Sequence, residues 1–238
     1  MQRQETNEVY MLLDESSKKW NRMIPSMPTA RWHPSILSLP SALIVAGGYN
    51  LSTNATYRNT VEIFKPDTSQ WYRTDPLPTA CLGMSLVATG NTCYALGGYF
   101  EGSHLNQALH TSIDDLLHNA VPASQIARRG SSDSQSAWKA LPSTPSYRPA
   151  AAILVGNLLA IGGRETSCGG AAKKEVYMYS PSTDSWIYIS DLPAPRSYTT
   201  ATVLSSIEVL VIGGRGAYTC RENTVYQGTL TCTMGTYY

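Results

Sequence analysis

Paired glycines that each end an apolar run are the feature that most restricts how this chain can fold. The pairs begin at intervals of 50, 65 and 51 residues, at Gly47, Gly97, Gly162 and Gly213. Tryptophans follow the same rhythm, at intervals of 51, 67 and 48 residues: Trp20, Trp71, Trp138 and Trp186. Two separate residue types therefore mark one repeating unit, which predicts an array of similar structural blocks. A further pair, Gly169-Gly170, follows no apolar run, and we interpret it as part of a loop.

Each unit is predicted to hold four strands in a constant order, A to D. Strand A is a small-residue or aliphatic run such as AAILV, strand B ends in Gly-Gly, and strand D begins at the tryptophan. Strand C is a β-like segment, found as EVYM at 8–11 and 175–178, NTVEIF at 59–64 and NTVYQG at 223–228. Strand B is apolar at consecutive residues, as in VLVI at 209–212, which indicates burial on both faces. Such a sheet, covered on both faces by neighbours, is typical of a propeller blade.

An aromatic residue and a turn complete the pattern. The aromatic residue lies seven positions before the tryptophan, as Phe64 does before Trp71 and Tyr179 before Trp186, and a proline-rich turn then ends in arginine in three of four units. Together with Gly-Gly, this pattern resembles the kelch repeat over nearly the whole chain. The resemblance implies an all-β fold, a kelch-type β-propeller. Two departures are Cys81, in place of the turn arginine, and LL at 12–13, where the aromatic residue is expected before Trp20.

The strand count predicts about four four-stranded blades plus a half blade, in a single domain over residues 1–238. Residues 8–24 supply strands C and D of one blade, residues 197–230 supply A, B and C of another, and the final TLTCTMGTYY is the candidate for its strand D. Because the family's common form has six blades, we expect an incomplete ring of a larger propeller. Open blade edges would then favour self-association.

The longest unit carries an insertion at about 114–136, between strand C near residues 110–113 and Trp138. Residues 114–119 are predicted to form one helical turn. The Ser-rich stretch beyond it, with Arg128, Arg129 and Gly130, is too polar to be buried and is predicted to be a mobile loop. We interpret the insertion as a tolerated surface loop, with a docking or modification site as the alternative.

Composition excludes several classes of partner and compartment. Lys and Arg number 18 against 17 Asp and Glu, so net charge attracts neither nucleic acid nor a membrane surface. The start has no secretory pattern, and no apolar run is long enough to span a bilayer. The 5 cysteines lack any C-x-x-C pair, which favours free thiols over disulfides or a zinc site. We therefore expect a soluble, cytoplasmic protein.

The residue patterns of catalytic chemistry are missing from the sequence. The 4 histidines lack metal-ligand spacing, and each repeated Gly-Gly ends a strand with no helix after it, so it is no phosphate loop. STDSW at 182–186 is similar to the Asp-box of sialidase propellers but lacks its glycine. We predict no metal, no cofactor and no enzymatic activity, although propeller enzymes draw catalytic residues from several blades.

The kelch resemblance also implies where a partner binds. In kelch proteins that this chain resembles, the loops after Gly-Gly and the turns before strand A form a peptide-binding mouth. The loops supply Tyr49, Tyr99, His104, Arg164 and Arg215, and the turns supply Arg31, His33, Tyr147, Arg148, Arg196 and Tyr198. Tyr and Arg are frequent in interface hot spots, and Arg binds carboxylate or phosphate through two hydrogen bonds, so an acidic peptide is the expected ligand.

Alternatives remain at this point. Arg31, Arg148 and Arg196 are equally well explained as scaffold residues that hydrogen-bond backbone carbonyls between blades. The leading hypothesis for the chain is a protein-protein interaction module, for example the substrate-recognition part of an adaptor such as a BTB-kelch ubiquitin-ligase subunit. The alternatives are a sugar-active propeller enzyme, oxidase or sialidase-like, and an actin cross-linker.

Overall fold

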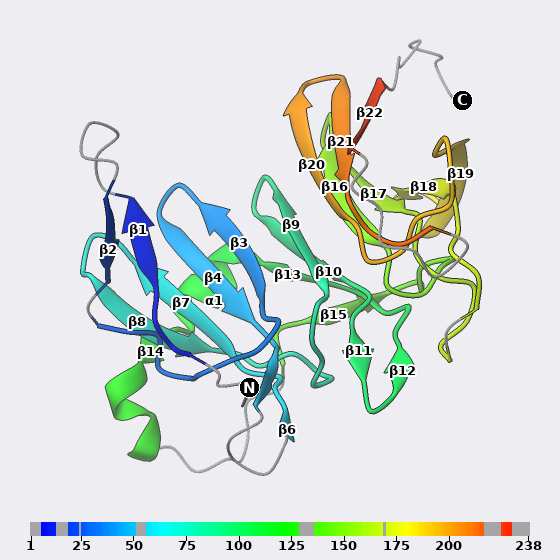
Figure 1. The fold of residues 1–238 in the computed structure, drawn as a ribbon. Helices are drawn as coiled ribbons and strands as arrows, with labels where there is room; N and C mark the ends of the chain where they lie inside the picture. The colour runs from blue at the N-terminus through cyan, green and yellow to red at the C-terminus, as the bar shows by residue number, and fades with distance from the viewer. Residues whose placement is uncertain are drawn as a thin grey trace. The chain divides into compact units, whose positions relative to one another are not determined.

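The structure is a computed structural model, which describes residues 6–12, 19–23, 25–50, 56–128, 136–168, 170–216 and 225–229. Regular structure in these residues is almost entirely β, as predicted, and it consists of antiparallel meanders (Figure 1). The helical exceptions among them are α1 (Ile113–His118) and a 3-10 helix, η1 (Ala123–Arg128). In the same residues, no helix is long and apolar enough to cross a membrane.

Three sheets contain the predicted strands A to D in that order. The first holds β3 (Ser35–Leu39), β4 (Ala42–Ala46), β7 (Val61–Lys65) and β8 (Gln70–Thr74). The second holds β9 (Ser85–Thr89), β10 (Thr92–Leu96), β13 (Ala108–Ser112) and β15 (Lys139–Leu141). The third holds β16 (Ala150–Leu154), β17 (Asn157–Ile161), β18 (Glu175–Ser180) and β19 (Ser185–Asp191).

The sheets nearest the two ends of the chain have fewer strands. At the start, β1 (Tyr10–Leu12) pairs with β2 (Trp20–Arg22), which are the predicted strands C and D. Near the end, β20 (Thr200–Ser205), β21 (Glu208–Ile212) and β22 (Val225–Thr229) supply A, B and C. The strand D expected in the final segment falls on residues 230–238, outside the described residues.

The chain divides into two compact units, which we describe separately. Unit 1 comprises residues 1–83 and 111–138, and unit 2 comprises residues 84–110 and 139–238. Short hairpins follow Gly-Gly in both, and the sequence pattern did not predict them. In unit 1, β5 (Tyr49–Asn50) pairs with β6 (Thr56–Tyr57), and in unit 2, β11 (Tyr99–Phe100) pairs with β12 (Ser103–His104).

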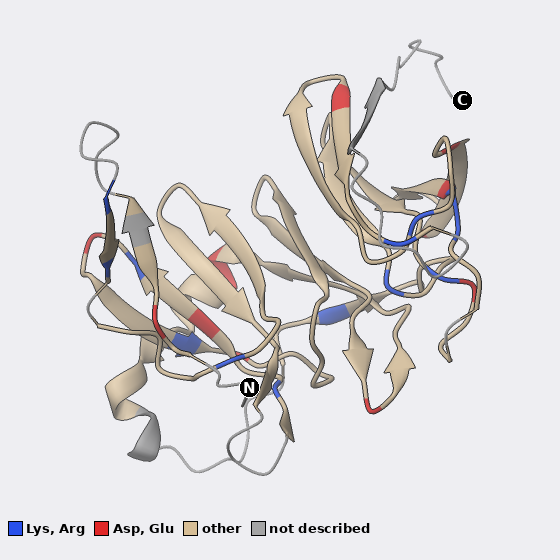
Figure 2. Cartoon of the chain, viewed as in Figure 1, with Lys and Arg blue, Asp and Glu red and all other residues tan. Residues whose placement is uncertain are grey.

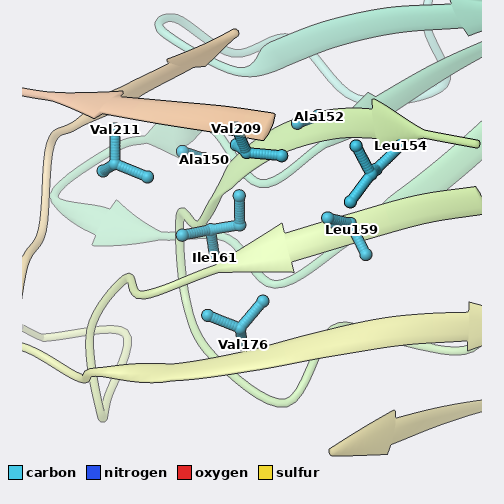
Figure 3. Close-up of a cluster of buried hydrophobic side chains, with 8 residues drawn as sticks. All are labelled: Ala150, Ala152, Leu154, Leu159, Ile161, Val176, Val209 and Val211. Atoms are coloured by element: carbon cyan, nitrogen blue, oxygen red, sulfur yellow. The ribbon is translucent and has the colours of Figure 1, made fainter. Parts of the chain in front are cut away.

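Strand B is buried on both faces, as its continuous apolar sequence predicted. In β17, Leu159 and Ile161 belong to a core with Val209 and Val211 of β21 (Figure 3). The alternate residues Leu158 and Ala160 belong to a second core, with Leu96 and Ala108 of the preceding sheet and Tyr179. Successive side chains of a strand point to opposite faces, so one strand contributes to both cores. This is the layer structure of packed propeller blades.

In two sheets, the repeated tryptophan of strand D packs on an aromatic ring and hydrogen-bonds to a neighbouring turn. Trp71 lies 5.3 Å from Phe64 between ring centroids, and its indole N–H donates to the Pro25 carbonyl at 3.1 Å. Trp186 lies 5.5 Å from Tyr179 and donates to the Pro142 carbonyl at 2.8 Å. Each indole therefore buries its apolar surface while satisfying its donor.

Trp20 departs from this pattern. Its side chain is 67 % exposed, whereas the repeat predicted that it would fill a gap between blades. Trp20 lies on β2, in a sheet of two strands. Without strands A and B beside it, the indole has little surface on which to pack, so the repeat position alone does not ensure burial.

The first part of the insertion contains short regular elements. The predicted helical turn is α1, which Ser112 caps by accepting a hydrogen bond from the Asp115 N–H, and Thr74 Oγ1 donates to the Leu116 carbonyl at 2.7 Å. Beyond it, β14 (Val121–Pro122) pairs with β8, and η1 follows. Residues 121–128, inside the segment predicted to be a mobile loop, therefore have regular structure. Residues 129–135 lie outside the described residues.

Candidate functional site

The two predicted loop sets meet through paired backbone hydrogen bonds. Arg164 and Tyr147 exchange N–H···O bonds of 2.8 and 2.9 Å, and Arg215 and Ser197 exchange bonds of 2.7 and 2.9 Å. In unit 1, Tyr49 and Trp32 make the same exchange, at 2.9 and 2.8 Å. Each exchange joins the residue after Gly-Gly to the turn before strand A. The two loop sets therefore lie together at one end of these sheets.

Glycine is required for this close approach. Gly163 has a φ of 102°, and a Cβ at that position would lie 2.7 Å from the Tyr147 carbonyl oxygen. Any other residue would force the two loops apart and strain the backbone. The second glycine of the repeat therefore explains why the loop after strand B can pair with the turn.

The structure corrects the repeat position of Arg148. The residue two positions before strand A has a φ between 50° and 59° in every case: His33, Gly83, Arg148 and Tyr198. Arg31 and Arg196 lie two positions earlier, and Ser146 occupies that place in the Arg148 turn. Arg148 is therefore not the equivalent of the other two arginines. The proline-rich turn before Arg148 differs in spacing from the other turns, and for this reason the sequence pattern aligned Arg148 with Arg31 and Arg196.

Arg31 is a buried residue of unit 1. Its guanidinium donates to the carbonyls of Gly47 and Thr60 at 2.6 and 3.0 Å, and it forms an ion pair of 2.9 Å with Glu62. Both side chains of that pair are 0 % exposed. Burial lowers the pKa of Arg31, and the Glu62 carboxylate acts in the opposite direction. These contacts correspond to the scaffold alternative.

The equivalents of Arg31 in unit 2 are also buried. Ser146 Oγ donates to the Gly162 carbonyl at 2.5 Å. This bond is equivalent to the one that Arg31 donates to the Gly47 carbonyl in unit 1. Arg196 is 3 % exposed, and its carbonyl accepts from the Gly163 N–H at 2.8 Å. Because neither Arg31 nor Arg196 offers an accessible guanidinium, we leave both out of the candidate site.

Unit 1 presents aromatic side chains on its loops. Tyr49 and Tyr57 face each other across the β5–β6 hairpin with centroids 4.8 Å apart, and Trp32 lies 5.3 Å from His33. Trp32 is 43 % exposed. We call Trp32, His33, Tyr49 and Tyr57 the aromatic cluster.

Unit 2 presents arginines around one tyrosine. The guanidinium carbons of Arg148, Arg164 and Arg215 lie 4.8, 5.5 and 5.4 Å from the centroid of the Tyr198 ring. These are cation–π distances. Tyr198 is 38 % exposed, so the arrangement lies at the surface. With Tyr99 and His104, described next, these residues make up what we call the Arg–Tyr cluster.

His104 anchors the cluster from beneath. Its Nε2 lies 3.1 Å from the Tyr198 hydroxyl, and its ring lies 5.2 Å from Tyr99 and 5.5 Å from Tyr198 between centroids. The β11–β12 hairpin supplies both Tyr99 and His104, and the His104 N–H donates to the Ser167 carbonyl at 2.7 Å. A buried side chain thus fixes the exposed tyrosine.

Separate turns and loops position the three arginines. The Arg148 N–H donates to the Leu105 carbonyl at 2.7 Å, immediately before β16. Arg164 follows β17, and its guanidinium donates to the Gly170 carbonyl at 2.7 Å and contacts Ser197 Oγ at 3.5 Å. Arg215 follows β21 and is exposed. Three segments that are distant in sequence therefore converge on one ring.

The positive charge of the cluster affects the pKa of His104. Burial, and to a lesser extent the positive charges of Arg148 and Arg164, together lower the pKa of His104 to about 4. At neutral pH the imidazole is therefore uncharged, and the charge of the cluster comes from its three guanidinium groups. In Figure 2, lysine and arginine segments gather in the loops beside the sheets β16–β19 and β20–β22.

The cluster is equipped to bind an anion. Guanidinium groups offer paired N–H donors that match the oxygens of carboxylate and phosphate. Among the described residues, no group of three or more His, Cys, Asp or Glu side chains could hold a metal ion.

The sequence-predicted site residues therefore separate into several groups. Tyr99, His104, Arg148, Arg164, Arg215 and Tyr198 come together in unit 2. Tyr49 and His33 belong to the aromatic cluster, Tyr147 supports Arg164 through its backbone, and Arg31 and Arg196 are buried. Trp32 and Tyr57 were missed. Trp32 directly follows the repeat arginine, and its position beside that residue was the available signal.

Comparisons with known proteins agree with the repeat pattern. The chain is 28 % identical to Kelch-like protein 41b of Danio rerio over 204 residues, which are 85 % of this chain and 30 % of that protein. It is 29 % identical to Beta-scruin of Limulus polyphemus over 104 residues, 43 % of this chain and 11 % of that protein. The chain thus spans less than a third of the length of either relative.

A solved structure and a family model complete the comparison. The structure of YjhT shares the fold, with a TM-score of 0.70 at 12 % identity, over 92 % of this chain and 72 % of that one. The family model of the KLHDC2/KLHL20/DRC7 Kelch-repeats domain matches residues 1–214. Since that match spans most of the chain, the chain belongs to the KLHDC2/KLHL20/DRC7 Kelch-repeats domain family.

Proposed function

We propose that this chain is a non-enzymatic protein-interaction domain, which binds a peptide or protein partner through the Arg–Tyr cluster of unit 2. The observation that carries the proposal is the convergence of Arg148, Arg164 and Arg215 within 5.5 Å of the exposed Tyr198 ring. Arginine and tyrosine dominate the hot spots of protein interfaces. Loops fixed on a rigid scaffold are also the usual place for binding residues.

The ligand of the cluster is proposed to be acidic. Three guanidinium groups favour an anion. His104 is neutral at neutral pH, so the charge that the ligand meets is that of the three arginines. The cluster is also held in place before the ligand arrives. Tyr198 is bonded to a buried histidine, and the backbones of Arg164 and Arg215 are held by paired hydrogen bonds, so little backbone entropy is lost on binding.

Retention of a random peptide library by the immobilised full chain tests this proposal. We expect acidic peptides to be enriched by the wild-type protein. Replacing Arg164 and Arg215 with alanine should reduce retention by about tenfold or more for each hot-spot arginine. Lys65→Ala is the matched control, because Lys65 lies 4.8 Å from the Tyr72 ring in unit 1, in a similar cation–π pair outside the cluster.

Two outcomes would refute the proposal. One is a wild-type protein that enriches no peptides. The other is a double arginine variant that keeps its melting temperature and retains the same peptides as the wild type. The melting temperature is needed because Arg164 also bonds the Gly170 carbonyl, and a folding defect must be distinguished from a lost contact.

A sugar-active enzyme is the second candidate, and one observation favours it. Sialidases use a tyrosine as nucleophile, and Tyr198 lies among three arginines. Its hydroxyl lies 3.1 Å from His104 Nε2, and this contact would orient the nucleophile. Turnover in a glycan screen that is lost in Tyr198→Phe would favour the enzyme, while unchanged glycans together with peptide binding would exclude it.

Self-association is a further part of the proposal, and a second copy of the chain is the partner. Among the residues that the structure describes, the last sheet carries exposed apolar side chains, with Leu204 56 % and Ile212 40 % exposed. In the preceding sheet, the residue equivalent to Ile212 is Ile161, which is 2 % exposed because the next sheet packs on it. Sedimentation velocity should show mass increasing with concentration. A monomer over the whole range would contradict self-association.

The chain is also proposed to be part of a larger cytoplasmic adaptor. The chain corresponds to 30 % of Kelch-like protein 41b, which suits the partner-binding part of a larger adaptor. Cys81 and Cys93 are buried and Cys168 is exposed, and none of these three cysteines forms a disulfide, which supports a reducing compartment such as the cytoplasm. Fractionation of cells that express the tagged protein would test the compartment.

A further inference from the structure

We infer that the Arg–Tyr cluster selects a phosphorylated side chain over a carboxylate, so that the partner presents a phosphopeptide. The inference rests on the proposed function, since it specifies the ligand of the same site. It follows from the charge of the cluster, from the separate origin of its cations and from their fixed placement.

The first step is the charge of the cluster. Arg148, Arg164 and Arg215 carry three positive charges around one ring. The charged groups that shift the pKa of His104 are both arginines, Arg148 and Arg164, and both lower it. The potential at the base of the cluster is therefore positive. A phosphate ester carries about −1.5 to −2 charges at neutral pH, whereas a carboxylate carries one, so phosphate gains more from this potential.

The second step is the number of acceptors. A phosphate monoester has three terminal oxygens that accept hydrogen bonds, and a carboxylate has two. The three guanidinium groups come from three separate segments: the turn before β16, the loop after β17 and the loop after β21. A compact anion with three acceptors can bridge groups that approach from separate directions. A planar carboxylate is satisfied by a single arginine fork.

The third step is the fixed placement of these groups. Tyr198 is joined to His104 at 3.1 Å, and Ser197, next to it, exchanges backbone hydrogen bonds with Arg215. Ser197 Oγ also lies 3.5 Å from the Arg164 guanidinium. Arg164 and Arg215 thus both contact Ser197, the residue next to the one that carries the ring. A preorganised set of donors discriminates between anions by charge and shape, because it does not rearrange to suit the weaker ligand.

Three matched peptide libraries test the inference on the full chain. The libraries share random flanking positions and carry serine, glutamate or phosphoserine at the central position, and retained peptides are quantified by mass spectrometry. We expect phosphoserine peptides to be retained about tenfold or more over both other libraries, and raised salt to weaken that retention. Arg148→Ala and Arg215→Ala should each abolish most of the preference, and Lys65→Ala should preserve it.

The outcomes separate this inference from the proposed function. Equal retention of glutamate and phosphoserine peptides, lost in Arg215→Ala, would overturn the phosphate preference and leave the acidic-peptide site intact. Retention of none of the libraries by the wild-type chain would overturn both. A phosphoserine preference that survives in the folded Arg148→Ala and Arg215→Ala variants would place phosphate binding elsewhere and overturn the inference.

Discussion

The loops of the two units occupy the same repeat positions and carry different chemistry. After Gly-Gly, unit 1 has Tyr49, where the last two loops of unit 2 have Arg164 and Arg215. At the turn position with positive φ, unit 1 has His33 and Gly83, where unit 2 has Arg148 and Tyr198. The same backbone exchange holds these loops in both units. The repeat therefore sets where the loop side chains lie, and the residues at those positions decide what they bind.

The buried positions show a similar contrast. In unit 1, Arg31 and Glu62 form an ion pair with no exposed surface. In unit 2, the positions that correspond to them through the strand registers are Ser146 and Tyr177, and Ser146 makes a neutral hydrogen bond to Gly162. The scaffold therefore accepts either charged or neutral chemistry inside the sheet. Breaking the Arg31–Glu62 pair in unit 1 should therefore cost more stability than changing the neutral residues at the same positions of this unit 2 sheet.

The largest expected effect comes from breaking the buried pair of unit 1. Glu62→Gln removes the carboxylate that faces both Arg31 at 2.9 Å and Arg73 at 3.0 Å, and leaves Arg31 as a buried charge. We expect a loss of about 3–5 kcal/mol in the free energy of unfolding. Tyr177→Phe in unit 2 is the matched control, with an expected loss below about 1 kcal/mol. Denaturant unfolding measures both, and equal losses would remove the contrast.

The tryptophans give a comparison inside unit 1. Trp71→Ala removes a side chain that is 4 % exposed, and should cost about 3–5 kcal/mol in the free energy of unfolding. Trp20→Ala removes one that is 67 % exposed, and should cost less than about 0.5 kcal/mol. Thermal melting of the two variants tests this difference. A large destabilisation by Trp20→Ala would show that the indole is covered in solution.

Exchanging residues between the loops tests whether chemistry or position controls binding. Arg215→Tyr introduces the residue that unit 1 carries as Tyr49, and should reduce retention of acidic peptides by about tenfold, because a charge-assisted hydrogen bond is lost. The reverse change, Tyr49→Arg, should leave retention unaltered, because its neighbours are aromatic. If Tyr49→Arg instead raised retention to a similar extent, any arginine at this position would bind and the cluster itself would be unimportant.

Acid should weaken unit 2 through His104, with a smaller effect. The pKa of His104 is about 4 in the folded protein, against an ordinary 6.5 that applies when unfolded. Between these values the unfolded state binds the extra proton, so stability decreases as the pH falls through this window. We expect the melting temperature to fall by about 2–4 °C from pH ~7 to pH ~5. His104→Gln should lose this part of the pH dependence, and an equal fall in that variant would assign it to other groups.

Much of the fold could be predicted from the sequence because the repeat is local. The order of strands A to D, the burial of both faces of β17 and the helical turn at α1 all follow from residue patterns within short segments. Trp20 shows the limit of this approach. Its burial depends on strands that its sheet does not contain, and the repeat position holds no information about them.

The candidate site was only partly predictable, since it depends on distant contacts. Arginines and tyrosines in the loops could be listed from the repeat, but His104 and Tyr198 are separated by 94 residues and meet only in the folded unit. The equivalence of Arg148 with Arg31 was wrong, because a turn of different spacing placed Ser146 at the buried position. Only the register of the strands resolves such a shift.

The affinity of one retained peptide for variants of the two loop clusters tests the central claim most directly. Titration calorimetry would compare the Arg148→Ala, Arg215→Ala double variant of unit 2 with the Trp32→Ala, Tyr49→Ala double variant of unit 1. Our account predicts that the first loses about a hundredfold in affinity and the second less than about twofold, since hot spots are confined to a few central residues. The opposite ranking, with both variants folded, would place the binding site on the aromatic cluster and contradict the account.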